Sequence, residues 1–191
     1  MRVVAGQYRR RQLRTLSGQK LRPTSDRLRE TLFNVLSAGA VPMENSVWFD
    51  LFAGSGAVGI EALSRGAATV YFVESHRAAA TVIRQNLASL AIENGFELLQ
   101  RDCFHALQQL RTRAVKCDFC FLDPPYAEAE AYGRTLEGLA NLPLLHAAGI
   151  VIAEHDRRFD PGDGFTGPAA RLQRFRQLVQ GDSTLSFYAP A

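Results

Sequence analysis

The chain has 191 residues, of which 47% are hydrophobic and 21% are charged, so its composition excludes a disordered tail and a collagen-like repeat and fits one folded domain. No run approaches the roughly 18 apolar residues of a membrane-spanning helix, and no apolar signal segment follows Met1. Three cysteines cannot form a full disulfide framework. We therefore expect a cytoplasmic protein with reduced thiols and no membrane contact.

The net charge of +3 is distributed unevenly along the chain. Residues 1–30 contain nine basic and two acidic side chains, a net charge of +7, whereas the remaining 161 residues carry −4. Arginine outnumbers lysine 20 to 2, and its planar guanidinium binds phosphate through two hydrogen bonds and stacks on bases. Such a segment is typical of a face that binds a polyanion, and the alternative is a charged face exposed to solvent. The candidate phosphate-binding residues are Arg9, Arg10, Arg11, Arg14 and Arg22.

Residues 1–40 are predicted to form an extension in front of the core of the domain. Residues 1–5 and 8–13 flank Gly6 and predict a short basic β-hairpin. A polar loop follows, and then Ser25 and its neighbours supply N-cap chemistry for a helix over residues 24–36. The apolar residues of this helix fall on one face, so we expect that face to pack against the core.

Residues 46–191, the predicted core, alternate apolar strand patterns with helical patterns. Strands are expected at residues 47–52, 69–74, 96–100, 119–122 and 149–153, helices at 59–65 and 78–90, and a closing antiparallel hairpin at 172–178 and 184–188. Alternating strands and helices imply right-handed crossovers and a parallel sheet. We therefore predict a single α/β domain over residues 1–191, with a Rossmann-like, mostly parallel seven-stranded sheet covered by helices on both faces. Ligands of such sheets bind at the carboxyl ends of the strands.

A glycine-rich turn follows the first strand of this core. Gly54, Gly56 and Gly59 match the spacing of a dinucleotide-binding turn, and Glu74 at the end of the next strand could accept both hydrogen bonds of a ribose diol. Asp50, four residues before the first glycine, would oppose a pyrophosphate but favour a cationic ligand. The pattern therefore favours S-adenosylmethionine, which carries a sulfonium and an ammonium, over a nicotinamide dinucleotide.

A second motif, Asp123-Pro124-Pro125-Tyr126, directly follows an apolar strand and so lies at the same sheet edge as the glycine-rich turn. The prolines stiffen the turn and leave carbonyl oxygens facing outward. A carboxylate and a proline carbonyl can both accept hydrogen bonds from an exocyclic amino group, while an aromatic ring stacks on its base. The alternative is a strand-ending turn in which Asp123 is a local cap. Together the two motifs predict methylation of an amino group.

The sequence resembles class I methyltransferases that carry an Asp/Asn-Pro-Pro-aromatic motif and methylate amino groups. The block Arg22-Pro23-Thr24-Ser25-Asp26-Arg27-Leu28-Arg29-Glu30-Thr31-Leu32-Phe33-Asn34, taken with residues 50–65, closely resembles the RsmD family. The resemblance implies a methyltransferase that uses S-adenosylmethionine and modifies N2 of one guanine in 16S ribosomal RNA, either free or in the small ribosomal subunit particle. It extends from the basic hairpin through the Pro-Pro motif and weakens after Glu154.

The same resemblance implies roles for individual residues. The glycine-rich turn would hold the methionine part of the cofactor, Glu74 the ribose hydroxyls and Asp102 the adenine amino group. Asp123 and the Pro124 carbonyl would receive the guanine N2 hydrogens while Tyr126 stacks on the base. The candidate cofactor-binding residues are Asp50, Ala53, Gly54, Gly56, Glu74 and Asp102, and the candidate catalytic residues are Asp123, Pro124 and Tyr126.

Three alternative functions remain open at this level. A DNA adenine-N6 methyltransferase would use the same motifs, but it usually needs a target-recognition region for which 191 residues leave little room. A nicotinamide-dependent oxidoreductase would fit the glycine spacing, and a non-catalytic RNA-binding or assembly module would fit the basic segment. Cys117 and Cys120 have zinc-ligand spacing but lie on an expected buried strand, so we predict no metal site. We also expect a monomer.

Overall fold

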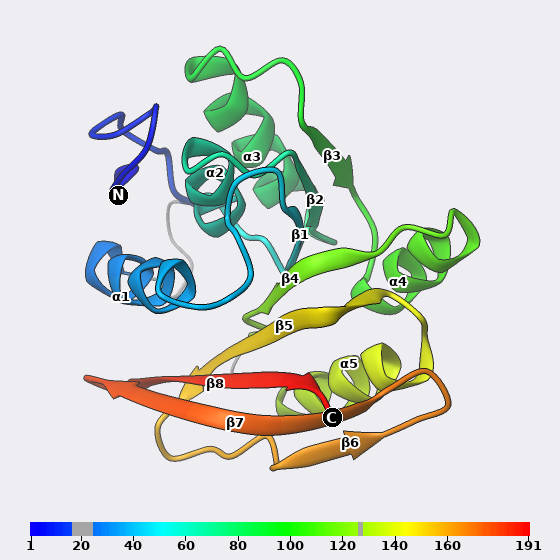
Figure 1. Cartoon of the computed structure of the whole chain (residues 1–191). Coiled ribbons are helices and arrows are strands. Elements are labelled where there is room, and N and C mark those ends of the chain that lie inside the picture. Colours follow the sequence, from blue (N-terminus) through cyan, green and yellow to red (C-terminus); the bar gives the residue numbers. More distant parts are fainter. Residues whose placement is uncertain (17–24, 126–127) are drawn as a thin grey trace.

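A single eight-stranded sheet runs through the protein in the order β3-β2-β1-β4-β5-β8-β7-β6 (Figure 1). The computed structural model describes residues 1–16, 25–125 and 128–191. The strands are β1 (Val47–Leu51), β2 (Thr69–Val73), β3 (Phe96–Leu99), β4 (Cys117–Leu122), β5 (Leu145–Asp156), β6 (Gly164–Thr166), β7 (Arg171–Gln180) and β8 (Ser183–Pro190). The helices are α1 (Asp26–Ser37), α2 (Ala57–Ser64), α3 (Arg77–Ser89), α4 (Cys103–Thr112) and α5 (Ala129–Asn141).

Strands β1 to β5 pair with one another in parallel. Antiparallel pairing joins β5 to β8, β8 to β7 and β7 to β6. This confirms the Rossmann-like, mostly parallel α/β class. The expected number of seven strands is wrong, because the three-residue strand β6 pairs with β7 at the edge and raises the number to eight. A three-residue strand whose middle residue alone is partly buried has too little hydrophobic pattern to be read from sequence.

Helices cover both faces of the sheet. Helices α1, α2 and α3 pack with one face into a core that contains Phe33, Trp48 and Phe72, and α4 and α5 pack with the other face around Phe49 and Tyr132. Because successive strand residues point to opposite faces, each strand contributes alternately to the two cores. This is why the central strands are almost entirely apolar, and why an acid on one of them needs a separate explanation.

The N-terminal segment is less regular than the predicted hairpin. A single antiparallel bridge joins Arg2 and Gln12, and no strand forms within residues 1–16. Three backbone hydrogen bonds nevertheless join the two arms of the predicted hairpin, from Val3 N–H to Arg11 O, Arg10 N–H to Val3 O and Leu13 N–H to Met1 O. The segment is also held by α2: both oxygens of the buried Glu61 carboxylate accept hydrogen bonds, from the Val4 and Ala5 backbone N–H groups at 2.7 and 2.9 Å. A tertiary acceptor thus satisfies donors that the short hairpin leaves unpaired.

The bounds of helix α1 and strand β5 differ from the predicted ones. Helix α1 begins at Asp26 with the Ser25 side chain accepting from the Leu28 N–H, as the N-cap chemistry indicated, and ends at Ser37. Strand β5 is longer than expected at both ends, because β8 pairs with it as far as Asp156 and β4 pairs with its first residue, Leu145. No helix within the described residues is long and apolar enough to cross a membrane.

Candidate active site

The glycine-rich turn between β1 and α2 has an unusual backbone. Phe52, Gly54 and Gly56 have φ values of +61°, +55° and +76°, a region that glycine adopts readily and other residues rarely do. A Cβ atom added to Gly54 would meet no atom within 4 Å, so this part of the turn faces open space. The turn can therefore bring its backbone into direct contact with a ligand.

Glu74 fixes the position of this turn. One oxygen of its buried carboxylate accepts a hydrogen bond from the Gly54 N–H at 2.8 Å, and the other accepts from the His76 N–H at 2.7 Å, at the start of α3. Its two oxygens keep further lone pairs for a ligand. The sequence-predicted partners Gly54 and Glu74, 20 residues apart in the chain, are thus in direct contact.

Asp50 lies beneath the turn. It is buried, and its Oδ2 accepts a hydrogen bond from the Gly59 N–H at 2.9 Å. Gly56, the N-cap of α2, makes no side-chain capping bond, so Asp50 supplies the acceptor from the neighbouring strand. Burial raises the pKa of Asp50 to about 7, a shift that the Gly59 hydrogen bond opposes and the Glu74 charge reinforces. A nearby cation would favour its ionised form.

Asp123 directly follows β4. Leu122, the preceding residue, pairs with Leu51 on one side and Ala153 on the other, so Asp123 emerges between β1 and β5. Asp123 is partly exposed, and Pro124 beside it is buried. The protein atoms that surround its carboxyl remove most of its hydration, and this desolvation, followed by the charges of Glu154 and Asp50, raises the pKa of Asp123 well above its ordinary value.

Four acids therefore form a row along the carboxyl edge of four adjacent strands. Following the strand order β2-β1-β4-β5, the row consists of Glu74, Asp50, Asp123 and Glu154. The strand registers place Glu74, Asp123 and Glu154 at one level and Asp50 two residues lower, all on the face covered by α1, α2 and α3. Among the described residues, the charges that act on Asp50 and Asp123 are those of acids, and Arg29 on α1 acts on Glu154. The part of the edge at Asp50 and Asp123 therefore suits a cation.

Asp102 is at the same edge, after β3, and forms the N-cap of α4. Its carboxylate accepts from the His105 backbone N–H at 3.1 Å and pairs with the His105 ring, while its side chain is 55% exposed. Burial alone would raise the pKa of Asp102, but the two hydrogen bonds from His105 outweigh it and lower the pKa. The carboxylate is ionised and accessible, as an acceptor for a ligand amino group must be.

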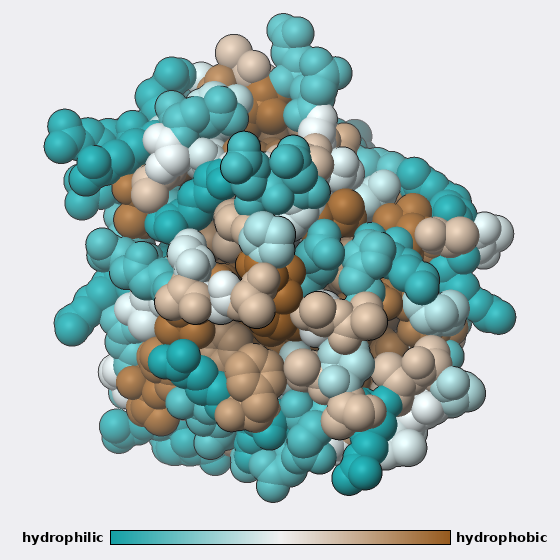
Figure 2. All heavy atoms as spheres, in the orientation of Figure 1, coloured by the Kyte–Doolittle hydropathy of each residue, from teal (hydrophilic) through white to brown (hydrophobic). Residues whose placement is uncertain are grey.

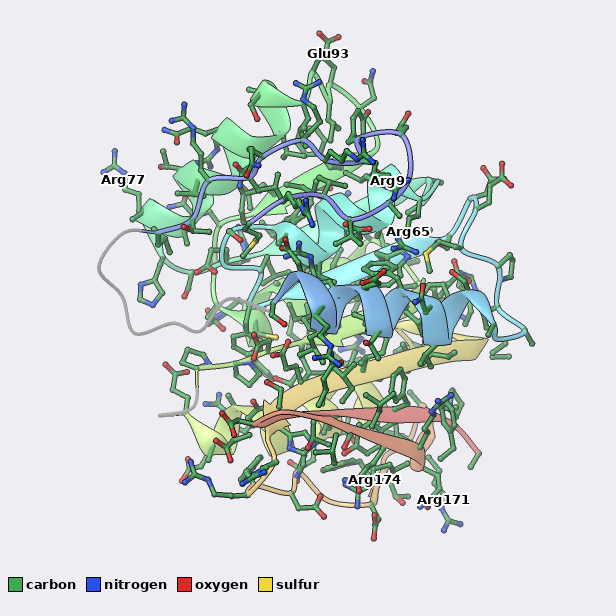
Figure 3. All side chains as sticks on the ribbon, turned by 90° about the vertical axis from the view of Figure 1, so that its left-hand side faces the viewer. Arg9, Arg65, Arg77, Glu93, Arg171 and Arg174 are labelled. Carbon is green, nitrogen blue, oxygen red and sulfur yellow. The ribbon has the colours of Figure 1, made fainter. Side chains whose placement is uncertain are left out.

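The basic N-terminal segment lies beside the glycine-rich turn. Arg9, Arg10, Arg11 and Arg14 are exposed, and hydrophilic side chains cover this corner of the molecule at the upper left of Figure 2. Figure 3 shows Arg9 on this segment and Arg77 at the start of α3, far from Arg171 and Arg174 at the opposite end. Two predicted residues, Arg22 and Tyr126, lie outside the described residues.

Asn86 on α3 connects the N-terminal segment to the turn and was not predicted. This fully buried amide donates to the Ser55 carbonyl at 2.9 Å and to the Arg14 carbonyl at 3.1 Å, and accepts from the Arg14 N–H at 2.8 Å. A lone asparagine within a helical pattern carries no sequence signal for such a role. The Asn86 side chain therefore connects the glycine-rich turn to the basic N-terminal segment.

We expect Asn86→Ala to lower the free energy of unfolding by about 2–4 kcal/mol, because partly buried hydrogen bonds to the backbone of Arg14 and Ser55 are lost together with a buried amide. Urea unfolding followed by circular dichroism measures this change. The control is Gln85→Ala, an exposed neighbour whose side chain bonds only the Arg14 guanidinium among the described contacts, for which we expect a change within about 0.5 kcal/mol. Equal effects of the two substitutions would contradict the proposed connection.

Within the described residues, no group of three or more His, Cys, Asp or Glu side chains could hold a metal ion. Cys117 and Cys120 are buried in β4. The row of acids contains residues of both sequence motifs, Asp50 and Asp123. The geometry thus unites an open glycine-rich turn, a row of acids and a basic segment at one edge of a Rossmann-like sheet.

Comparison with known proteins gives this arrangement a family. A family model described as Conserved hypothetical protein 95 matches residues 1–189. The chain belongs to this family, the RsmD-type methyltransferases. It is 34% identical to YlbH of Bacillus subtilis over 160 residues, which are 84% of this chain and 85% of that protein. It is 39% identical to ribosomal RNA small subunit methyltransferase D of Escherichia coli over 126 residues, which are 66% of this chain and 60% of that protein.

Solved structures agree with the RsmD-type assignment. The Escherichia coli protein yhhF superposes with a TM-score of 0.82 at 32% identity, over 100% of this chain and 97% of that one. SMU.776, a methyltransferase-like structure complexed with SAH, has a TM-score of 0.64 at 15% identity, covers 86% of this chain and 49% of that one, and shows a shared fold. The RsmD-type fold therefore extends over the whole chain, including the antiparallel end of the sheet.

Proposed function

We propose that this RsmD-type chain transfers a methyl group from S-adenosylmethionine to the exocyclic N2 amino group of a guanine in small-subunit ribosomal RNA, as a single domain acting as a monomer. The row of four acids carries this proposal, because it suits a ligand with a sulfonium and an ammonium and repels the pyrophosphate of a dinucleotide. The relatives named as ribosomal RNA small subunit methyltransferase D support the RNA substrate.

The residues of the glycine-rich turn fit such a cofactor. The open space at Gly54 would admit a ligand against the backbone, and Asp50, Ala53 and Gly56 would bind its methionine part. Glu74 would accept hydrogen bonds from the ribose, and Asp102 would accept one from the adenine amino group. The bound cofactor supplies an electrophilic methyl group.

At the other side of this position, the Asp123 carboxylate and the Pro124 carbonyl would accept the two hydrogens of the guanine amino group. This arrangement aims the nitrogen lone pair at the methyl carbon, and such positioning provides much of the rate of a group transfer. Tyr126 would stack on the base. Methyl transfer would form a nitrogen–carbon bond as the carbon–sulfur bond breaks, the sulfur would leave as the neutral thioether, and the proton lost from the product nitrogen would pass to Asp123 or to water.

The test is transfer of radiolabelled methyl groups from S-adenosylmethionine to small-subunit particles, or to their RNA, from a bacterial strain that lacks the enzyme. Genomic DNA is assayed in parallel, and the products are digested to nucleosides. We expect label in N2-methylguanosine. Label in N6-methyladenine of DNA would retain the site but overturn the RNA substrate, and cofactor binding without any transfer would indicate a non-catalytic RNA-binding module.

Replacing Arg9, Arg10 and Arg11 with alanine is expected to raise the KM for RNA and to reduce the slope of log affinity against log salt by about 2, since each lost phosphate contact removes about 0.7–0.9 from that slope. Cofactor affinity should not change. The charge-matched control replaces three exposed arginines on other elements, Arg111, Arg157 and Arg171. If that control changes the slope as much as the first variant does, the RNA-binding face lies elsewhere.

A further inference from the structure

Glu154 is the member of the acid row to which neither sequence motif assigns a role. It follows Ala153 on β5, and Ala153 pairs with Leu122, the residue before Asp123. Adjacent strands are about 4.8 Å apart, so Glu154 lies directly beside Asp123. Ile152 and Phe121, two residues earlier on each strand, pack in the same core with α1. The side chains of Glu154 and Asp123 therefore project from the same face of the sheet.

Glu154 is held in place from both sides of the sheet. The Tyr132 hydroxyl on α5 donates to the Glu154 backbone carbonyl at 2.8 Å, and the Ser183 hydroxyl on β8 donates to its Oε1 at 3.3 Å. The residue is only 3% exposed, and burying a carboxylate is unfavourable unless a partner compensates it. The positive charge of Arg29 on α1 acts on Glu154 and is one such partner.

The neighbouring acids match one edge of guanine. Guanine presents two adjacent kinds of donor on its Watson–Crick edge, N1–H and the N2 amino group, whereas adenine presents an acceptor at N1. An ionised carboxylate can only accept hydrogen bonds. A carboxylate beside the one that holds the amino group would therefore bind guanine N1–H and face the N1 lone pair of adenine with repulsion.

We propose that Glu154 accepts the hydrogen bond of guanine N1–H and so makes the pocket select a guanine over bases that carry an acceptor at N1. This rests on the proposed function, because it assigns the base specificity of the same site. The pair of acids would also favour a donor-rich base, because the charges of Glu154 and Asp50 add to burial in raising the pKa of Asp123. Two donors from one base offset that repulsion.

The test uses a synthetic RNA fragment in which the target guanine is replaced by 2-aminopurine. This base keeps the 2-amino group but has an acceptor at N1. We expect the wild-type enzyme to prefer guanine, in kcat/KM, by about 100-fold. In Glu154→Gln the glutamine amide can donate to the N1 acceptor, so this preference should fall by about tenfold or more. Cofactor affinity and the thermal unfolding midpoint are measured for both proteins.

The outcomes separate the two proposals. If Glu154 only balances Arg29 or stabilises the fold, Glu154→Gln will lower both activities equally and leave the ratio unchanged, which overturns this inference alone. If the wild-type enzyme methylates no guanine RNA, the proposed function itself fails. The control Asp156→Asn removes an acid of the same strand that pairs with Arg158, and should leave the ratio unchanged. Should Glu154→Gln not fold, Ser183→Ala, which removes a hydrogen bond to Glu154, should shift the ratio in the same direction by about twofold to fivefold.

Discussion

Replacement of Asp123 by alanine is expected to lower the single-turnover rate of methyl transfer by about a thousandfold. A loss of this size is usual when an enzyme loses a group that orients the reacting atom and accepts its proton. The carboxyl lies between β1 and β5 at the edge where the glycine-rich turn opens, and the described residues that follow it directly, Pro124 and Pro125, carry no acid that could replace it. Rapid-quench measurement with saturating cofactor and RNA gives this rate directly.

The control for this prediction is Asp123→Asn. Its amide oxygen can still accept one amino hydrogen, so we expect a loss of about tenfold to a hundredfold only. Both variants should bind S-adenosylmethionine within about twofold of wild type, because Asp123 is assigned to the base and not to the cofactor. Near-normal turnover by Asp123→Ala would remove the residue from the reaction, and a parallel loss of cofactor affinity would place it in the cofactor site instead.

The second prediction concerns the pH dependence of cofactor binding. Because the pKa of Asp50 is raised to about 7 in the free protein, its carboxyl is protonated below that pH and ionised above it. A sulfonium or ammonium favours the ionised form, so the affinity for S-adenosylmethionine should increase as pH rises through about 7 and level off above it. Calorimetry in buffers of different ionisation enthalpy should show proton release on binding below the same pH.

Asp50→Asn provides the matched test. It should weaken S-adenosylmethionine binding by about tenfold above pH 7, roughly 1.4 kcal/mol, and remove the pH dependence. The raised pKa also means that ionising Asp50 destabilises the free protein, an effect that grows between the ordinary pKa of 3.8 and about 7. The variant should therefore unfold at an equal or higher temperature than wild type above pH 7. An unchanged affinity together with an unchanged pH profile would refute the charge argument.

Much of the candidate site could be predicted because its parts are local in sequence. A glycine-rich turn between a strand and a helix, an acid before it and a Pro-Pro turn after another strand are each written in a few consecutive residues. Their meeting at one edge follows from parallel topology, since the carboxyl ends of parallel strands lie together. Gly54 and Glu74 are accordingly in contact, as their spacing indicated.

Other features depend on contacts between distant segments. Asn86 and Glu61 look like ordinary polar residues in helices, yet they hold the N-terminal segment through backbone groups 72 and about 57 residues away. The predicted hairpin forms in an irregular way for the same reason: backbone hydrogen bonds and one bridge join its arms, while Glu61 accepts the Val4 and Ala5 N–H groups. Local pattern cannot show which distant acceptor a backbone group will find.

By itself the sequence determined the alternation of strands and helices, the two motifs and the basic character of the first thirty residues, because each is a property of neighbouring residues. Only the tertiary structure decided that Asp50 and Glu74 complete the turn through backbone hydrogen bonds, and that Glu154 lies beside Asp123. The physical reason is that strand register and burial are set by the whole sheet. The structure thus places Glu154 on β5 beside Asp123 at the end of β4, a pairing that the local pattern of neither strand shows.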